Sequence, residues 1–431
     1  MKNARVSTTL FSSVQWLFFI FANTIVVPIS IGAAFHLPSD VIESTIRSSL
    51  IFTGIASVLQ GWIGHKYPVM EGHSGLLWGV MLNLGLSASA FGLSYTEIGG
   101  GMATGFIAAG IVTLLLSAFN LISFLQKIFT PMVMTVYLFL LSFQLIFVFF
   151  KGMLGITSKG EISISISILS VCIVLFVSIL KLKGSRIISN FSILIGIIVG
   201  WLFYSILFGS DAKEVGAASA HFSLFPLGAP NLEIGIIAIS FFAGIMNLSN
   251  TFASIKAASD LLKEEASTKQ YRFSLFFTGS FTIIAALFGI VPYTPFTSSL
   301  GFLQSTQIYE RKPFIYGGAL LAIIGVLPPL ISFLATMPVT VGNAVLFVAY
   351  LQLFGTAFSS TNGKVFTSDT IFRLAAPVLV GVSLMNISPG TFGNLPMIVQ
   401  PFLTNGLIMG VILSILLEKS INWNQFEKVK G

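Results

Sequence analysis

The sequence predicts an all-α polytopic membrane protein, because apolar residues dominate, charges are scarce and long apolar runs recur along the whole chain. Of 431 residues, 55% are hydrophobic and only 9% are charged, and the mean hydropathy is +0.94. Soluble domains carry roughly 25% charged residues. A helix that crosses a bilayer needs roughly 20 mostly apolar residues, so the chain has room for about a dozen or more spans. This composition excludes a soluble protein.

The apolar runs between turn and charge signals predict fourteen membrane spans, with twelve as the alternative count. The first run is too long for the apolar part of a signal peptide and no clear cleavage site follows it, so we expect it to be the first span. The expected spans cover residues 13–35, 46–64, 68–84, 101–122, 131–150, 163–181, 188–208, 232–256, 273–291, 293–308, 314–334, 338–357, 372–387 and 398–417.

The basic residues predict which ends of the spans face the cytoplasm. With the N-terminus inside, only Arg47, Lys151, Lys159 and Lys213 fall on outer segments, and the other 18 of the 22 Lys and Arg fall on inner ones. Basic loops are retained on the cytoplasmic side. We therefore expect a multi-pass protein of the cytoplasmic membrane with both termini inside. The net charge of +7 then reflects topology, and no nucleic-acid partner is expected.

Two pairs of similar segments predict an internal repeat. The stretches around Pro131 and Pro338 are alike and lie 207 residues apart, and those around Pro68 and Pro292 lie 224 residues apart. The similar offsets favour two halves of seven spans, and an odd number of spans per half makes the repeat inverted. The alternative is that Pro and Gly merely recur in membrane helices.

Pro and Gly interrupt two of the expected spans at corresponding positions of the two halves. Residues 67–75 read YPVMEGHSG, and residues 291–301 read VPYTPFTSSLG. Irregular backbone at membrane depth is tolerated only inside protein or along a wet cavity. In inverted-repeat transporters such breaks lie at the substrate site, which we therefore expect here. The alternative is a pair of ordinary turns between helices.

Polar residues in and near these breaks are the candidate ligands of a small molecule. Glu71 is the only acid expected deep in the membrane, where an ionisable group is costly and often functional. With His73, which titrates near neutral pH, it forms the candidate coupling pair, unless both lie solvated near the cytoplasmic surface. The candidate binding residues are Glu71, Gly72, His73, Ser74, Ser298, Ser299 and Gly301 of the breaks, Asn247 and Thr251 of the eighth span, and Gln15 of the first. Those of the eighth and first spans equally suit hydrogen bonds between helices.

Other signatures of chemistry are absent from the sequence. It contains no P-loop and no metal-ligand spacing, which argues against an ATP-driven pump and a metal site. We expect no enzymatic activity and no cofactor, with H⁺ or Na⁺ as the coupling ion.

At these residues the chain resembles the nucleobase/ascorbate transporter family, also called nucleobase:cation symporters of the second kind, which includes uracil, xanthine and uric acid permeases. The resemblance covers nearly the whole chain. It rests on Gln15 with Pro28, on Pro68, Gly72 and Ser74, on Ala243-Gly244-Ile245, and on Pro292 to Thr306.

The resemblance implies two domains that move relative to each other. The core domain would comprise spans 1–4 (residues 1–122) and 8–11 (residues 232–334), and the gate domain spans 5–7 (residues 123–209) and 12–14 (residues 335–431). Short extended stretches in spans 3 and 10 would hold a base between them. A homodimer through the gate domain and coupling to H⁺ or Na⁺ are also implied.

The chain departs from the family's pattern at its acidic positions. The usual substrate-binding Glu of the eighth span falls on Asn247, and the Asp a turn later falls on Thr251. The motif of the tenth span reads Ser298-Ser299-Leu300-Gly301, without its acid or amide. We hypothesise that Glu71 replaces the missing acids.

The sequence and the resemblance together predict a secondary transporter for a nucleobase, with a purine such as xanthine or uric acid as the expected substrate. A carrier of an aromatic or small anion, such as benzoate or sulfate, is the alternative within the same architecture. A channel or a scaffold without transport activity is the alternative from a different class.

Overall fold

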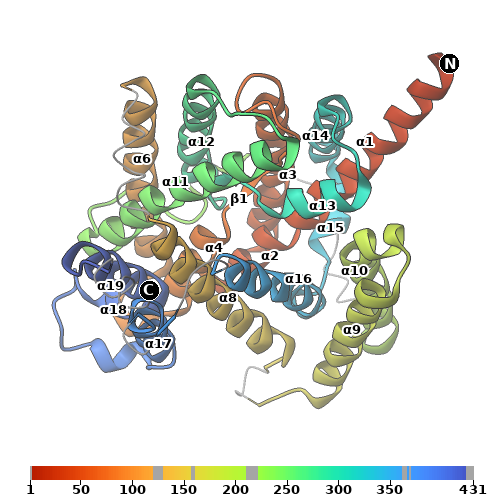
Figure 1. Ribbon diagram of the computed structural model, residues 1–431. Coiled ribbons are helices and arrows are strands. Elements are labelled where there is room, and N and C mark those ends of the chain that lie inside the picture. Colours follow the sequence, from red (N-terminus) through yellow and green to blue (C-terminus); the bar gives the residue numbers. More distant parts are fainter. Residues whose placement is uncertain are drawn as a thin grey trace.

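The computed structural model describes residues 2–119, 130–156, 161–209, 222–361, 366–367 and 370–423, which form a bundle of helices with one pair of short strands (Figure 1). The sequence-based orientation also used residues outside this part, namely Lys127, Lys159, Lys213, Lys364, Lys428 and Lys430. The expected domain boundary between residues 122 and 123 lies outside it as well.

The helices and strands occur in the following order along the chain. The first half contains α1 (Lys2–Thr24), α2 (Val26–Ala34), α3 (Ser39–Trp62), β1 (Glu71–His73), α4 (Gly75–Leu86), α5 (Ala88–Phe91), α6 (Tyr95–Ala118), α8 (Pro131–Met153), α9 (Ile164–Lys183) and α10 (Arg186–Phe208). The second half contains α11 (Ile234–Leu262), α12 (Thr268–Phe288), β2 (Tyr293–Pro295), α13 (Ser298–Thr306), α14 (Arg311–Val326), α15 (Pro328–Ala335), α16 (Val339–Ser359), α17 (Phe372–Met385), a 3-10 turn η1 (Pro389–Phe392), α18 (Gln400–Leu403) and α19 (Gly406–Ser420).

The number of helices that can span a membrane is smaller than the number of expected spans. Within the described ranges, nine helices are long and apolar enough, or ten if the bent pair α14 and α15 is one span. The helices α4 and α17 are apolar but shorter. The protein is thus a mostly helical polytopic membrane protein, and the count of fourteen spans stays a prediction.

Prolines break the span expected over residues 314–334. The helices α14 and α15 meet there at an angle of 86°. Pro328 lacks a backbone N–H and disfavours helical geometry in the residue before it. Leu327 accordingly has φ −90° and ψ 98°, which ends α14 and lets α15 begin in a new direction.

The helices pack in two groups, and α4 is one of several helices that connect them. In the first group α14 packs against α1 and α3, and α6 packs against α11 and α12. In the second group α8 packs against α16, α17 and α19, and α9 packs against α10 and α16. Figure 1 shows α17 to α19 at the lower left and α9 and α10 at the lower right. Helix α4 contacts α2 and α11 on one side and α8 on the other.

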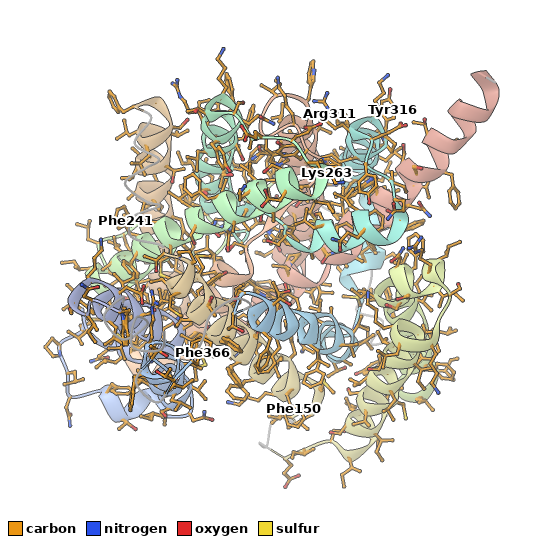
Figure 2. All side chains as sticks on the ribbon, in the orientation of Figure 1. Phe150, Phe241, Lys263, Arg311, Tyr316 and Phe366 are labelled. Carbon is orange, nitrogen blue, oxygen red and sulfur yellow. The ribbon has the colours of Figure 1, made fainter. Side chains whose placement is uncertain are left out.

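A cavity of about 1910 Å³ lies among the ends of α1, α3, α12 and α14. Its lining includes Lys66, Lys269 and Arg311, all of which the sequence places on inner segments. In Figure 2 two lining residues, Arg311 and Tyr316, lie at the same end of the molecule as Lys263. Basic residues expected on the inner side therefore gather at one end of the bundle.

Gly54 lies at a close approach of α3 and α14. A Cβ at this position would lie 2.5 Å from the carbonyl oxygen of Gly318 and 2.6 Å from the nitrogen of Ala322. Because overpacking of this kind costs about 1–3 kcal/mol, we expect Gly54→Ala to lower the thermal unfolding temperature of the purified protein in detergent.

The matched control for this substitution is Gly355→Ala. Gly355 also lies within a helix, α16, but a Cβ there would meet nothing within 4 Å. Alanine is the better helix former, so this variant should keep or raise the unfolding temperature. Equal unfolding temperatures for the two variants would contradict the close contact at Gly54.

Candidate functional site

The two broken segments meet as one antiparallel pair of strands. The register pairs Glu71 with Pro295, Gly72 with Thr294 and His73 with Tyr293, and all six residues are buried. Proline restricts the residue before it to extended conformations. Pro292 precedes β2 and Pro295 ends it, and Pro68 lies three residues before β1. The extended stretches expected in spans 3 and 10 are therefore confirmed.

Side chains of α3 and α11 form hydrogen bonds with backbone groups on the outer edges of this strand pair. On the β1 edge, the Ser57 hydroxyl accepts from the N–H of Glu71 at 3.2 Å and donates to its carbonyl at 3.3 Å. On the β2 edge, Asn247 Nδ2 donates to the carbonyl of Tyr293 at 2.8 Å, and the Ser254 hydroxyl donates to the last carbonyl of β2 at 2.9 Å. At membrane depth these partners replace water, without which each open edge would be costly.

Glu71 points to the face of the strand pair that packs on α3 and α12. Its carboxylate is fully buried, and it accepts from Gln60 Nε2 at 3.0 Å and from the Thr278 hydroxyl at 2.8 Å. Among the described residues no Lys, Arg or His forms an ion pair with it. A buried carboxylate with two neutral donors and no cation is costly in its ionised form.

His73 shares this face because successive strand residues alternate. Its Nδ1 donates to the carbonyl of Val291 at 2.8 Å, since a carbonyl can only accept. The ring meets the ring of Tyr293 edge-on, with 5.0 Å between the centroids. Nε2 has no partner in the part of the chain that the structure describes, and it is therefore an unused acceptor.

Gly72 and Thr294 point to the opposite face of the strand pair. A Cβ on Gly72 would lie 2.6 Å from Met70 Cε and 3.5 Å from the ring of Phe296, so a larger residue would displace Met70. The Thr294 hydroxyl is 4% exposed and finds no partner among the described residues. On this face Met70 lies close to the backbone of Gly72, and the Thr294 hydroxyl has no hydrogen-bond partner among the described residues.

A chain of hydrogen bonds runs from the end of β1 across α11 to α8. The Ser74 hydroxyl donates to Asn247 Oδ1 at 2.6 Å and also caps α4 by accepting from the N–H of Leu77. Asn250 Nδ2 lies 3.4 Å from Asn247 Oδ1 and 3.0 Å from the Tyr137 hydroxyl, and it donates to both. The chain thereby connects the strand pair to the second helix group.

The structure brings together only part of the predicted site. Ser74 and Asn247 are in direct contact, and Thr251 lies one turn further along α11, fully buried, with a hydroxyl that has no partner within the described ranges. The Ser299 hydroxyl accepts from the N–H of Met70 at 3.1 Å and so braces the entry to β1.

Other predicted residues lie apart from this contact. Ser298 and Gly301, at the start of α13, are exposed. Gln15 is buried on α1 and forms no hydrogen bond to Ser74 or Asn247 in the described part of the chain. The Glu71 carboxylate and the His73 ring lie on the face of the strands opposite to that of Gly72 and Thr294.

The site predicted from the sequence did not include Gln60, Thr278 or Tyr137. A periodic signal marks the first two, because each belongs to a polar stripe at helical spacing within an otherwise apolar span. The stripes are Thr53, Ser57 and Gln60 on α3, and Ser274, Thr278 and Thr282 on α12. For Tyr137 no comparable signal exists, since its partner lies 113 residues away.

Comparison with known protein families gives one match over most of the chain. Residues 7–390 match the family model Xan_ur_permease, described as "Permease family". The chain is 29% identical over 425 residues to "Putative purine permease YwdJ" of Bacillus subtilis, and the match covers 96% of each chain. It is 26% identical to the xanthine permease of the same organism, over 98% of this chain and 95% of that one. Its identity to the uric acid transporter UacT of Escherichia coli is 22%, over 95% of this chain and 85% of that one.

Solved structures share the fold at low sequence identity. The transmembrane domain of the cyanobacterial bicarbonate transporter BicA has a TM-score of 0.63 and 13% identity, over 94% of this chain and 96% of that one. The murine anion transporter Slc26a9, in an inward-facing state, has a TM-score of 0.63 and 14% identity, over 95% of this chain and 68% of that one.

The family match agrees with the motifs of the broken segments and of the eighth span, and the curated relatives are permeases, not enzymes. The chain therefore belongs to the permease family that the motifs indicated, the nucleobase/ascorbate or xanthine/uracil permeases.

Proposed function

We propose that this chain is a secondary transporter that carries a purine, such as xanthine or uric acid, across the cell membrane. The observation that carries the proposal is the strand pair joined to the Ser74–Asn247 contact. Directly after the strands, α4 begins at Gly75 and α13 at Ser298. Helix N-termini offer N–H groups and a partial positive charge. Such a site suits a flat heterocycle with polar edges, and three relatives are named for purines or their oxidised forms.

The two helix groups support a mechanism in which a core moves against a gate. We assign residues 1–122 and 232–334 to the core and residues 123–209 and 335–431 to the gate. The packing of α3, α6, α11, α12 and α14 among themselves, and of α8, α9, α10, α16, α17 and α19 among themselves, is consistent with this division. Fourteen spans in a 7+7 inverted repeat would follow if β1 with α4, β2 with α13, and the short helices α17 and α19 each complete one span.

We also propose an orientation of the protein in the membrane and a surface for its assembly into a dimer. The end of the bundle with the basic cavity would face the cytoplasm together with both termini, as the distribution of Lys and Arg favours. The outer faces of α9 and α10 carry exposed apolar side chains such as Leu175 and Leu202. These faces suit lipid and, in a homodimer formed through the gate, a second copy of the chain.

Glu71 is the proposed coupling residue, with H⁺ as the favoured ion and Na⁺ as the alternative, and His73 as its neighbour on the same face. The Thr278 hydroxyl lies 2.8 Å from the carboxylate and can donate to a carboxylate or accept from a carboxylic acid, so the cluster suits both protonation states. The Glu71 carboxylate faces α3 and α12, away from the proposed ligand site. Protonation of Glu71 would therefore influence that site through the backbone of β1. It does not need contact between Glu71 and the base.

Uptake into proteoliposomes tests the proposed substrate. We expect labelled xanthine or uric acid to accumulate under an imposed proton or sodium gradient, and preloaded unlabelled purine to accelerate entry by counterflow. Benzoate and sulfate should not compete. Competition by these anions without competition by purines would instead favour the anion carrier, and absence of counterflow with every compound would refute a transporter.

Substitution of Glu71 tests the coupling role. Glu71→Gln keeps a group that can accept from Gln60 and Thr278 but cannot take up a proton, so gradient-driven accumulation should be lost while counterflow persists. Glu43→Gln is the control, because Glu43 also lies on α3 and accepts from a hydroxyl, that of Ser332, at 3.0 Å. Gradient-driven accumulation with an unchanged pH profile in Glu71→Gln would remove Glu71 from the mechanism.

A further inference from the structure

The basic cavity among the ends of α1, α3, α12 and α14 is separate from the strand pair. Its lining comes mainly from α1, from the first turns of α12 and α14, and from the turn between α3 and β1. Within the described ranges, the lining includes no residue of β1 or β2 and none of α8, α9, α10, α16, α17 or α19. The cavity is therefore neither part of the proposed purine site nor a gap between the two helix groups.

Basic side chains outnumber carboxylates on the lining of this cavity. The basic residues are Lys66, Lys269, Arg311 and Lys312, and the acidic ones are Glu264 and Glu310. All four basic residues are exposed, and none of them forms an ion pair within the described part of the chain. The lining thus has an excess of two positive charges, and its cations are available to an anionic ligand.

Three of these cations lie at helix ends where positive charge is unfavourable. Lys269 lies in the first turn of α12, and Arg311 and Lys312 lie in the first turn of α14, and neither turn contains an acidic residue. The N-terminus of a helix carries a partial positive charge, so acidic residues stabilise it and basic residues do not. Glu310, at the N-cap of α14, forms no side-chain capping bond. An anion bound in the cavity would offset this local excess of positive charge.

Hydrogen bonds fix the turn that carries the fourth cation, Lys66. The N–H of Lys66 donates to the carbonyl of Gln60 at 3.0 Å, and Gln270 Nε2 donates to the carbonyl of His65 at 2.7 Å. Lys66 has a φ of 62°, in the left-handed region that residues other than glycine seldom adopt. The backbone of Lys66 is therefore tied to the first turn of α12, which carries Lys269.

The cavity extends from the basic residues onto an apolar face of α14. The lining residues of this face are Tyr316, Ala319, Leu320 and Ile323. Their helical spacing places them on one stripe about 10 Å long. Tyr316 and Ile323 are 52% and 58% exposed. Exposed apolar side chains of a spanning helix contact lipid chains, and tyrosine and basic residues lie at the level of the headgroups. The lining is thus charged at one end and apolar at the other.

We propose that this cavity binds an anionic phospholipid, with the phosphate among the four basic residues and an acyl chain along the stripe of α14. Basic pockets between membrane helices suit such headgroups. A soluble anion would use only the charged end, and a zwitterionic lipid would gain little from the excess of cations. The bound lipid joins the turn before β1 to the start of α14, which belong to different halves of the chain. The proposal does not depend on purine transport, because lipid binding is measured without a substrate.

Thermal unfolding of the purified full chain in a neutral detergent tests the occupant. The probes are dioleoyl phosphatidylglycerol, dioleoyl phosphatidylcholine, which has the same chains, and glycerol phosphate, which has the charge without the chains. A ligand of the folded state raises the unfolding temperature. We expect phosphatidylglycerol to raise it, and to do so less at high salt because ions screen exposed charges. No increase, or an equal increase with phosphatidylcholine or glycerol phosphate, would overturn the proposal.

A double variant, Lys66→Gln with Arg311→Gln, tests the place of binding. Removal of two of the four cations should weaken phosphatidylglycerol binding about tenfold or more, measured as the lipid-bound fraction by native mass spectrometry. The matched control is Lys183→Gln with Arg186→Gln, which removes the same charge from exposed side chains that do not line the cavity. Binding to the double variant at the wild-type level, or an equal loss in the control, would overturn the assignment of the site.

The same double variant separates lipid binding from a role in folding. Arg311→Gln removes a cation from the first turn of α14, so without lipid the variant should unfold at the wild-type temperature or above it. Only the increase caused by phosphatidylglycerol should be lost. A lower unfolding temperature without lipid, together with an unchanged increase on addition of lipid, would assign the two residues to the fold and overturn the proposal.

Discussion

The architecture depends on how two three-residue strands satisfy their backbone groups at membrane depth. Each strand has one edge paired with the other and one edge open, and neither lipid nor a dry protein interior supplies water to an open edge. Ser57 closes the β1 edge, and Asn247 and Ser254 close the β2 edge. The positions of α3 and α11 follow from this requirement, because the hydroxyl and amide groups must reach the strand backbone. Helix α1 also contacts β1, and α12 contacts β2.

The strand pair has two chemically different faces. One face presents Glu71 and His73 to the polar stripes of α3 and α12, and the other presents Gly72 and Thr294. The β1 backbone is common to both faces and therefore links the hydrogen bonds of Glu71 to the proposed ligand site. Asn247 closes the β2 edge and also belongs to the proposed ligand site. We therefore expect its substitution to lower stability as well as any ligand binding.

Much of the fold could be predicted from the sequence, because its determinants are local. Apolar runs marked where helices lie, and Pro68 and Pro292 marked the two extended breaks. The bend between α14 and α15 was missed, although Pro328 and Pro329 are visible in the sequence, since prolines in membrane spans do not by themselves fix an angle. The partners of Glu71 were not predicted, because Gln60 and Thr278 meet only through tertiary packing. The contact of Ser74 with Asn247 joins residues 173 positions apart, and no local pattern in the sequence predicts it.

The register of the strand pair has a consequence for biogenesis. Glu71 is opposite Pro295, so β1 leaves the ribosome 224 residues before its partner strand exists. Until then, the edge of β1 that pairs with β2 has no strand partner, although Ser57 of α3 can already bond to its other edge. Synthesis of the first part of the chain thus precedes completion of the polar interior. Pairing of the two strands is therefore a late step in the assembly of this fold.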